Sequence, residues 1–81
     1  MDRLMKWIDI HEITANTKTK QFAVSTKDGQ PLGEIRFFPR WRKYSFYPYS
    51  QTIYEADCLR DIANFCQART SDWREEVRKW K

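Results

Sequence analysis

Residues 33–47 decide the fold of this chain, and they read Gly-Glu-Ile-Arg-Phe-Phe-Pro-Arg-Trp-Arg-Lys-Tyr-Ser-Phe-Tyr. Apolar and polar side chains alternate on both sides of residues 39–42, which is the period of two that half-buried β-strands show. The connection is short enough for a hairpin, so the two halves are predicted to pair as antiparallel strands. One face of the first strand then carries Gly33, Ile35 and Phe37, and the other carries Glu34, Arg36 and Phe38.

Two more strands are predicted before this hairpin. Residues 5–13 alternate in the same way, and residues 22–26 follow as a second strand. Asp28-Gly29 is a strong signal for a tight turn, because glycine readily adopts the positive φ that such turns demand. Pro31 can open the next strand but could not sit in its middle, and Pro48 ends the last one.

From Glu55 onward the apolar period lengthens, which indicates an amphipathic helix. Its apolar stripe consists of Cys58, Leu59, Ile62, Phe65 and Cys66. Thr70-Ser71-Asp72 suits a helix N-cap, so the helix either breaks there and restarts or continues to the end of the chain. The apolar stripe of the tail is predicted to pack on the core or against a second subunit, and it comprises Trp73, Val77 and Trp80.

Together these elements predict an α+β fold, an antiparallel meander of three to four strands followed by a C-terminal helix packed on one sheet face. The 81 residues make one domain, in which residues 70–81 form a separate tail only if the helix breaks. A chain this short buries only ~60–65% of the surface that its unfolded form exposes, so large side chains must supply the core. Four Trp, four Tyr and five Phe are available for that purpose.

Composition and motifs argue against catalysis. His11 is the only histidine, no cysteine or serine has a base at motif spacing, and two glycines cannot make a phosphate-binding loop. No spacing fits a metal site, so we expect no enzyme, cofactor, metal or small-molecule substrate. Cys58 and Cys66 would lie ~12 Å apart on a helix, too far for a disulfide. With no signal peptide and no apolar run long enough for a membrane, we expect a soluble cytoplasmic protein.

The hairpin stretch also holds the only marked charge bias of the chain, with four cations against the single acid Glu34. Cations beside large planar side chains can bind phosphates, stack on bases or anchor a protein partner. The candidate binding residues are Arg36, Arg40, Trp41, Arg42, Lys43 and Tyr44.

The same residues also have a purely structural interpretation. Trp41 would cap one end of the core, and the neighbouring cations would be solvated charges that discourage edge-to-edge aggregation. Phe38 and Tyr47 strengthen the binding interpretation if they face away from the helix, because a helix covers only one face of a sheet.

The order of motifs is similar to that of a family of small, uncharacterised phage and prophage proteins. The resemblance spans residues 22–66 and rests on the Leu32-Gly33 strand start, Trp41-Arg42-Lys43-Tyr44, the Pro48 strand end and Cys58-Leu59-Arg60-Asp61-Ile62-Ala63. It implies an origin in a mobile element and no particular mechanism.

We therefore expect a non-enzymatic, phage-type accessory protein that acts by binding, with a slight preference for nucleic acid as its partner. The preference is slight because the net charge of +4 is modest for a dedicated DNA-binding protein. The alternatives are a protein-binding module that inhibits or modulates a host factor, and a homodimer formed through the spare sheet face or the tryptophan tail.

Overall fold

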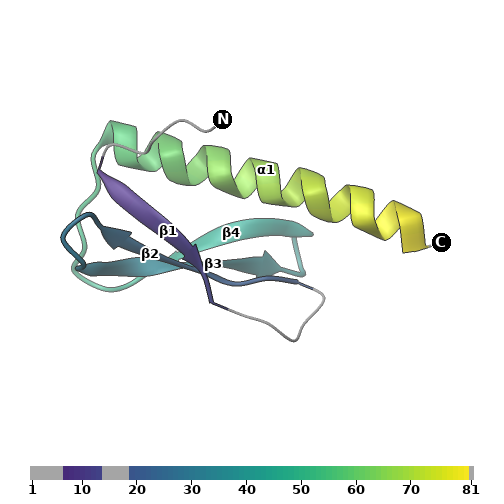
Figure 1. Cartoon of the computed structure of the whole chain (residues 1–81), viewed down its shortest axis with the longest axis horizontal. Helices are drawn as coiled ribbons and strands as arrows, with labels where there is room; N and C mark the ends of the chain where they lie inside the picture. The colour runs from purple at the N-terminus through teal and green to yellow at the C-terminus, as the bar shows by residue number, and fades with distance from the viewer. Residues whose placement is uncertain (1–6, 14–18, 81) are drawn as a thin grey trace.

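A computed structural model describes residues 7–13 and 19–80 of the chain. The strands are β1 (Ile8–Glu12), β2 (Phe22–Thr26), β3 (Pro31–Phe38) and β4 (Lys43–Pro48), and the helix α1 (Ala56–Trp80) follows them. The strands form one antiparallel sheet in the order β1-β2-β3-β4, and α1 lies across one face of it (Figure 1). The predicted α+β meander with a C-terminal helix is confirmed, with four strands. The start of the first predicted strand, residues 5 and 6, lies outside the described residues.

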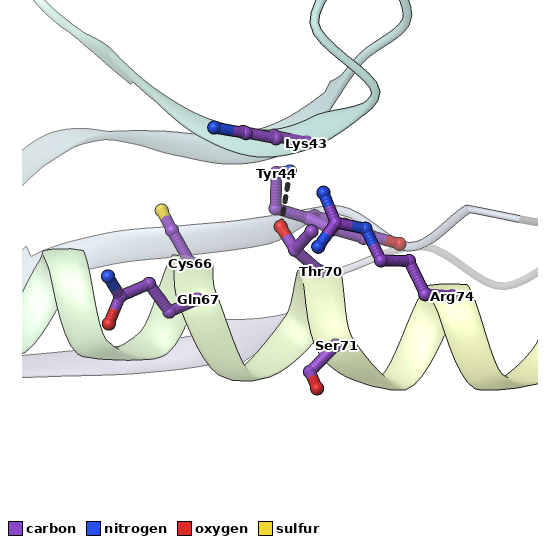
Figure 2. Close-up of a pocket in the computed structure, with 7 residues that line it drawn as sticks. All are labelled: Lys43, Tyr44, Cys66, Gln67, Thr70, Ser71 and Arg74. Carbon is purple, nitrogen blue, oxygen red and sulfur yellow. Dashed lines mark hydrogen bonds between the residues drawn. The ribbon is translucent and has the colours of Figure 1, made fainter.

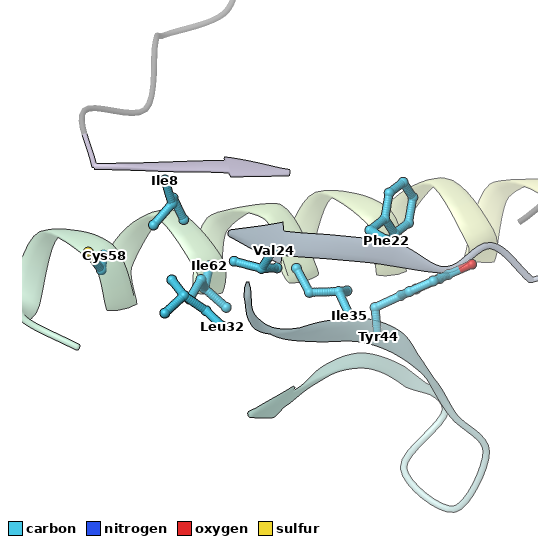
Figure 3. Packing of buried hydrophobic residues seen from close by; sticks show 8 residues of the cluster. All are labelled: Ile8, Phe22, Val24, Leu32, Ile35, Tyr44, Cys58 and Ile62. Carbon is cyan, nitrogen blue, oxygen red and sulfur yellow. The ribbon is translucent and has the colours of Figure 1, made fainter. Parts of the chain in front are cut away.

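The alternation in the strands divides the sheet into a face covered by α1 and an uncovered face. Ile35 of β3 is fully buried beneath α1, and its partners on the neighbouring strands are Phe22 and Phe46. Apolar side chains of the strands and of α1 meet in this layer (Figure 3). The buried core consists of Ile8, Phe22, Val24, Leu32, Ile35, Tyr44, Cys58 and Ile62.

Aromatic rings fill much of the space between the sheet and α1. Phe22 contacts Phe65 of α1 with 4.8 Å between ring centroids, and Phe37 contacts Trp73 at 4.5 Å. Tyr44 stands edge-on to both Phe22 and Phe37, at 6.4 and 5.6 Å. Each such ring removes ~150–250 Å² from water, which is how so short a chain obtains a core.

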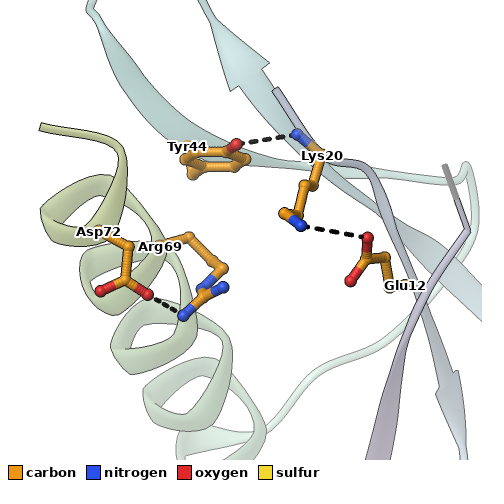
Figure 4. A network of polar contacts seen from close by, with 5 residues as sticks. All are labelled: Glu12, Lys20, Tyr44, Arg69 and Asp72. Atoms are coloured by element: carbon orange, nitrogen blue, oxygen red, sulfur yellow. Dashed lines mark hydrogen bonds and ion pairs between the residues drawn. The ribbon is translucent and has the colours of Figure 1, made fainter. Parts of the chain in front are cut away.

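Tyr44 reaches the margin of the core, where its hydroxyl meets polar groups (Figure 4). The hydroxyl accepts a hydrogen bond of 2.9 Å from the backbone N–H of Lys20. The ammonium group of Lys20 lies 3.6 Å from a carboxylate oxygen of Glu12, and Arg69 pairs with Asp72 on the adjacent face of α1. The phenol therefore packs as an apolar ring while its polar atom stays satisfied.

The helix does not break at Thr70; it runs without interruption from Ala56 to Trp80. Thr70 is buried, and its hydroxyl oxygen accepts a hydrogen bond of 2.8 Å from the backbone N–H of Tyr44 on β4. The side chain that suited an N-cap therefore binds the backbone of β4 and does not cap a helix. Trp73, one turn further on, rests on Phe37 and holds the following turn of α1 against the sheet.

One member of the predicted apolar stripe does not face the sheet. Leu59 is 51% exposed, whereas Cys58 and Ile62 are buried. Cys58 and Ile62 are four residues apart and share a helix face, while Leu59 lies ~100° further round the axis. The inclusion of Leu59 in the core stripe was therefore wrong.

Gly33 in β3 is held in close contact with β4. A Cβ atom placed on it would lie 2.5 Å from the carbonyl oxygen of Tyr47 and 2.9 Å from the ring of Phe46. The ring of Phe46 therefore covers the position where a side chain of residue 33 would stand.

Replacing Gly33 with alanine should destabilise the fold by ~1–3 kcal/mol, because the backbone of β4 must shift to admit the methyl group. Alanine in a strand is otherwise more favourable than glycine, so the expected sign is opposite to that of intrinsic propensity. Urea unfolding of Gly33→Ala measures the change. A variant as stable as the native chain would contradict the close packing of β3 on β4.

Replacing Thr70 with valine, which has nearly the same shape, should lower the free energy of unfolding by ~1–3 kcal/mol. The valine leaves the buried N–H of Tyr44 without an acceptor. Urea unfolding of Thr70→Val should be compared with Ser71→Ala, an exposed neighbour whose change should stay within ~0.5 kcal/mol. Equal losses in the two variants would show that the hydrogen bond contributes nothing particular.

Candidate binding surface on the uncovered sheet face

Three aromatic side chains on the uncovered side of the β3–β4 hairpin contact one another, and we call them the aromatic row: Phe38, Trp41 and Tyr47. The ring of Phe38 stands edge-on to that of Trp41, with 4.7 Å between centroids, and to that of Tyr47 at 6.5 Å. Trp41 is 63% exposed, while Phe38 and Tyr47 are half-buried. Phe38 and Tyr47 alternate with the core residues along β3 and β4, so they face away from α1. This is the condition under which they strengthen the binding interpretation.

Arg36 extends the aromatic row with a flat, charged group. Its guanidinium carbon lies 4.1 Å from the centroid of the Tyr47 ring, a cation–π contact. Its Nε lies 3.4 Å from a carboxylate oxygen of Glu34, which is an ion-pair distance without hydrogen-bond geometry. The hydroxyl of Tyr49 donates a hydrogen bond of 3.1 Å to the other oxygen of Glu34, and this bond raises the pKa of Tyr49. Glu34 therefore offsets the charge of Arg36 at this end of the row.

The turn between β3 and β4 presents its side chains outward. The carbonyl oxygen of Phe38 accepts hydrogen bonds from the backbone N–H groups of Trp41 and Arg42, at 3.2 and 2.9 Å. Closing the turn in this way places Arg42 in the left-handed region, with φ of 55°. That conformation favours glycine and costs an ordinary residue ~1–2 kcal/mol. An arginine therefore stands where backbone energy alone would select glycine or asparagine.

The cations without a carboxylate partner gather near this turn and on α1. Within residues 7–13 and 19–80, most Lys and Arg side chains lie within ion-pair distance of an acid. In the same part of the chain the cations with no such partner are Arg40, Arg42, Lys43, Arg74 and Lys79.

Of the six candidate binding residues, the structure separates Tyr44 from the rest. Tyr44 is only 7% exposed and lies beneath α1, because it shares its strand phase with Phe46 and its ladder position with Phe37. It is thus a core residue and cannot act as an exposed stacking group. Trp41 does not cap the core, since its ring lies on the uncovered face. The candidates that stay accessible are Arg36, Arg40, Trp41, Arg42 and Lys43.

The three residues of the predicted tail stripe, Trp73, Val77 and Trp80, also differ in their surroundings. Trp73 packs on Phe37, as predicted for a core role, and Val77 is half-buried. The side chain of Trp80 lies outside the described part of the chain. A role for this tail in a second-subunit contact stays a prediction.

Two features of the surface had only a weak signal in the sequence. The pairing of Glu34 with Tyr49 depends on the path of the chain after β4, and Arg74 lies far from the hairpin in sequence. An aromatic side chain following Pro48 was the hint of the first. The hint of the second was that Arg74 has no acid three residues away, unlike Arg60, Arg69 and Arg78.

Comparison with protein-family models, with curated proteins and with solved structures gives no match to this chain. Among the described residues, no group of three or more His, Cys, Asp and Glu side chains could hold a metal ion. The helix in the described range is too polar to cross a membrane.

The two cysteines are both free. Burial raises the pKa of the Cys66 thiol to about 11, and burial is also the largest cause of the raised pKa of Cys58. Thiols held in the neutral form are poor nucleophiles at neutral pH.

The Cys66 thiol should make stability depend on pH in the alkaline range. The folded chain retains this proton up to pH about 11, whereas the unfolded chain releases it near pH ~8.5. Its contribution is therefore complete below pH ~8.5 and is lost as the pH rises through the folded value. Urea unfolding at pH 8 and pH ~10.5 should show a larger loss for the native chain than for Cys66→Ala. A constant difference between the two would contradict the raised pKa.

Proposed function

We propose that this chain is a non-enzymatic binding protein that holds single-stranded nucleic acid on the uncovered sheet face and the β3–β4 turn. The observation that carries the proposal is the aromatic row with unpaired cations in the adjoining turn. Aromatic side chains on a sheet stack with unpaired bases, while cations beside them contact the phosphates. Bases inside a duplex are already stacked, so the row favours single strands.

The residues divide into two roles under this proposal. Trp41 offers the most exposed ring of the aromatic row and would stack on one base. Tyr47, with the guanidinium group of Arg36 over its ring, would form a second flat surface for stacking. Arg40 and Arg42 carry no partner acid among the described residues, so their charges are available for phosphates.

The left-handed Arg42 adds support from backbone energy. A residue that costs stability at an exposed turn, where glycine would relieve the cost, is an indication that its side chain serves a function. A guanidinium group that binds a phosphate through two hydrogen bonds would be such a function.

A protein partner is the second candidate, and one observation favours it. A hollow of about 190 Å³ lies beside the aromatic row, lined by Phe38, Trp41, Ser45, Phe46 and Tyr47. An apolar hollow of this kind could accept one anchoring side chain of a partner protein. The acid Glu34 on the same face also fits a protein surface better than a phosphate backbone. An origin in a phage or prophage stays a prediction, carried by the resemblance alone.

The test is a titration with an unstructured oligothymidylate of about 12 nucleotides, at two salt concentrations. Trp41→Ala should weaken binding by ~1–3 kcal/mol, roughly 5- to 150-fold in Kd, through loss of one stacked base. Arg40→Ala/Arg42→Gly should reduce the dependence of log Kd on log salt by about 1.4, since each lost phosphate contact removes ~0.7.

The Arg42→Gly change separates binding from folding. Glycine suits the left-handed position, so Arg42→Gly should unfold at the same urea concentration as the native chain or a higher one. Arg60→Ala, which removes a helix cation paired with Asp57, is the matched control and should leave Kd within twofold. No binding of the native chain at low salt would contradict a nucleic-acid function, and the hollow beside Trp41 would then direct the search to proteins.

A further inference from the structure

A groove separates the outer edge of β4 from α1 (Figure 2). Its volume is about 340 Å³, and its lining includes both Thr70 and Tyr44, which are joined by the hydrogen bond described above. None of the described residues that line it is acidic; they are Lys43, Tyr44, Cys66, Gln67, Thr70, Ser71 and Arg74.

Arg74 differs from the other arginines of α1. Arg60, Arg69 and Arg78 each pair with an acid three residues away, on Asp57, Asp72 and Glu75. The helix neighbours of Arg74 at that spacing are Ser71 and Val77, which carry no charge. Among the described residues Arg74 therefore has no ion-pair partner, and it is the arginine of α1 that lines the groove.

Lys43 lies on the opposite wall, on β4. It is likewise without an acid partner in the described ranges, and it is the ladder partner of Phe38. Figure 2 shows Lys43 on the strand and the guanidinium group of Arg74 reaching up from the helix toward β4. Two cations from different elements thus flank one open space.

The remaining polar groups suit an anion. The side-chain amide of Gln67 can donate hydrogen bonds at one end of the groove. The Cys66 thiol, with its pKa raised by burial, stays neutral and adds no opposing charge. Ser71 turns its hydroxyl away from β4, so it is not needed as a donor (Figure 2).

We propose that the groove between β4 and α1 is a phosphate-binding site in which Arg74 and Lys43 hold one phosphate group from two sides. A guanidinium group and an ammonium group are the side chains that proteins use most for this purpose. Resting on the proposed function, the phosphate is one of the nucleic-acid backbone. Because Lys43 and Phe38 are ladder partners, a strand stacked on the aromatic row can pass round the edge of β4 at Lys43 and reach Arg74.

The first experiment uses inorganic phosphate and needs no nucleic acid. In a ¹⁵N-labelled sample, millimolar phosphate should shift the backbone amide signals of Gln67, Ser71 and residue 74. The shifts should disappear in Arg74→Gln and persist in Arg78→Gln. The control removes a neighbouring arginine that is paired with Glu75. Shifts of equal size in the two variants, or none in the native chain, would overturn the site.

The second experiment uses oligothymidylates of two lengths, about 4 and about 12 nucleotides. With the longer strand, Arg74→Gln should raise Kd several-fold and reduce the salt dependence of log Kd by about 0.7, whereas Arg78→Gln should do neither. With the shorter strand, which covers only the aromatic row, both variants should bind like the native chain.

The two proposals fail in different ways. Loss of long-strand binding in Trp41→Ala, with no difference between Arg74→Gln and Arg78→Gln, would overturn the path through the groove and leave the aromatic row as the binding site. Phosphate shifts that depend on Arg74, with no oligonucleotide bound at low salt, would support the phosphate site and contradict the nucleic-acid function.

Discussion

The contact between Thr70 of α1 and the backbone N–H of Tyr44 on β4 is the interaction on which the arrangement of this protein depends. It lies near the middle of the helix and at the edge of the sheet, so it fixes how close α1 lies to β4 and which turn of the helix meets this strand. The apolar phase of the strands decides which face of the sheet α1 covers. Every aromatic side chain in phase with Tyr44 then belongs to the core. Side chains in the opposite phase are left to the solvent or to a partner.

This division explains why one short hairpin supplies both the core and the candidate surface. Phe37 and Phe38 are adjacent in sequence, yet Phe37 packs on Trp73 of the helix while Phe38 stands against Trp41 on the other side. The sheet is one layer thick, so neither ring can be moved to the opposite face without shifting the register of the whole strand. Folding and binding therefore make separate demands on alternate residues of the same strands.

Much of the fold could be predicted from sequence because strand phase is a local property. The period of two around Ile35, the Asp28-Gly29 turn and Pro48 are each visible within a few residues. The failures concern side chains whose surroundings come from distant parts of the chain. Thr70 has the chemistry of an N-cap, but its hydroxyl accepts a hydrogen bond from β4, which is far away in sequence. Tyr44 belongs by sequence to the basic turn. The sequence shows that Arg74 has no acid three residues away, but only the structure shows that it lines a groove beside β4.

The outer edge of β4 also limits how this protein can associate with extended chains. Tyr49 directs its N–H toward β3, so the alternation of the ladder points the backbone nitrogens of Tyr44, Phe46 and Pro48 outward. The backbone N–H of Tyr44 already donates its hydrogen bond to Thr70, and Pro48 has no N–H. A fifth strand added at β4 would find a single donor, that of Phe46, along its length. The outer edge of β4 therefore offers little to a partner that would bind by adding a strand to the sheet.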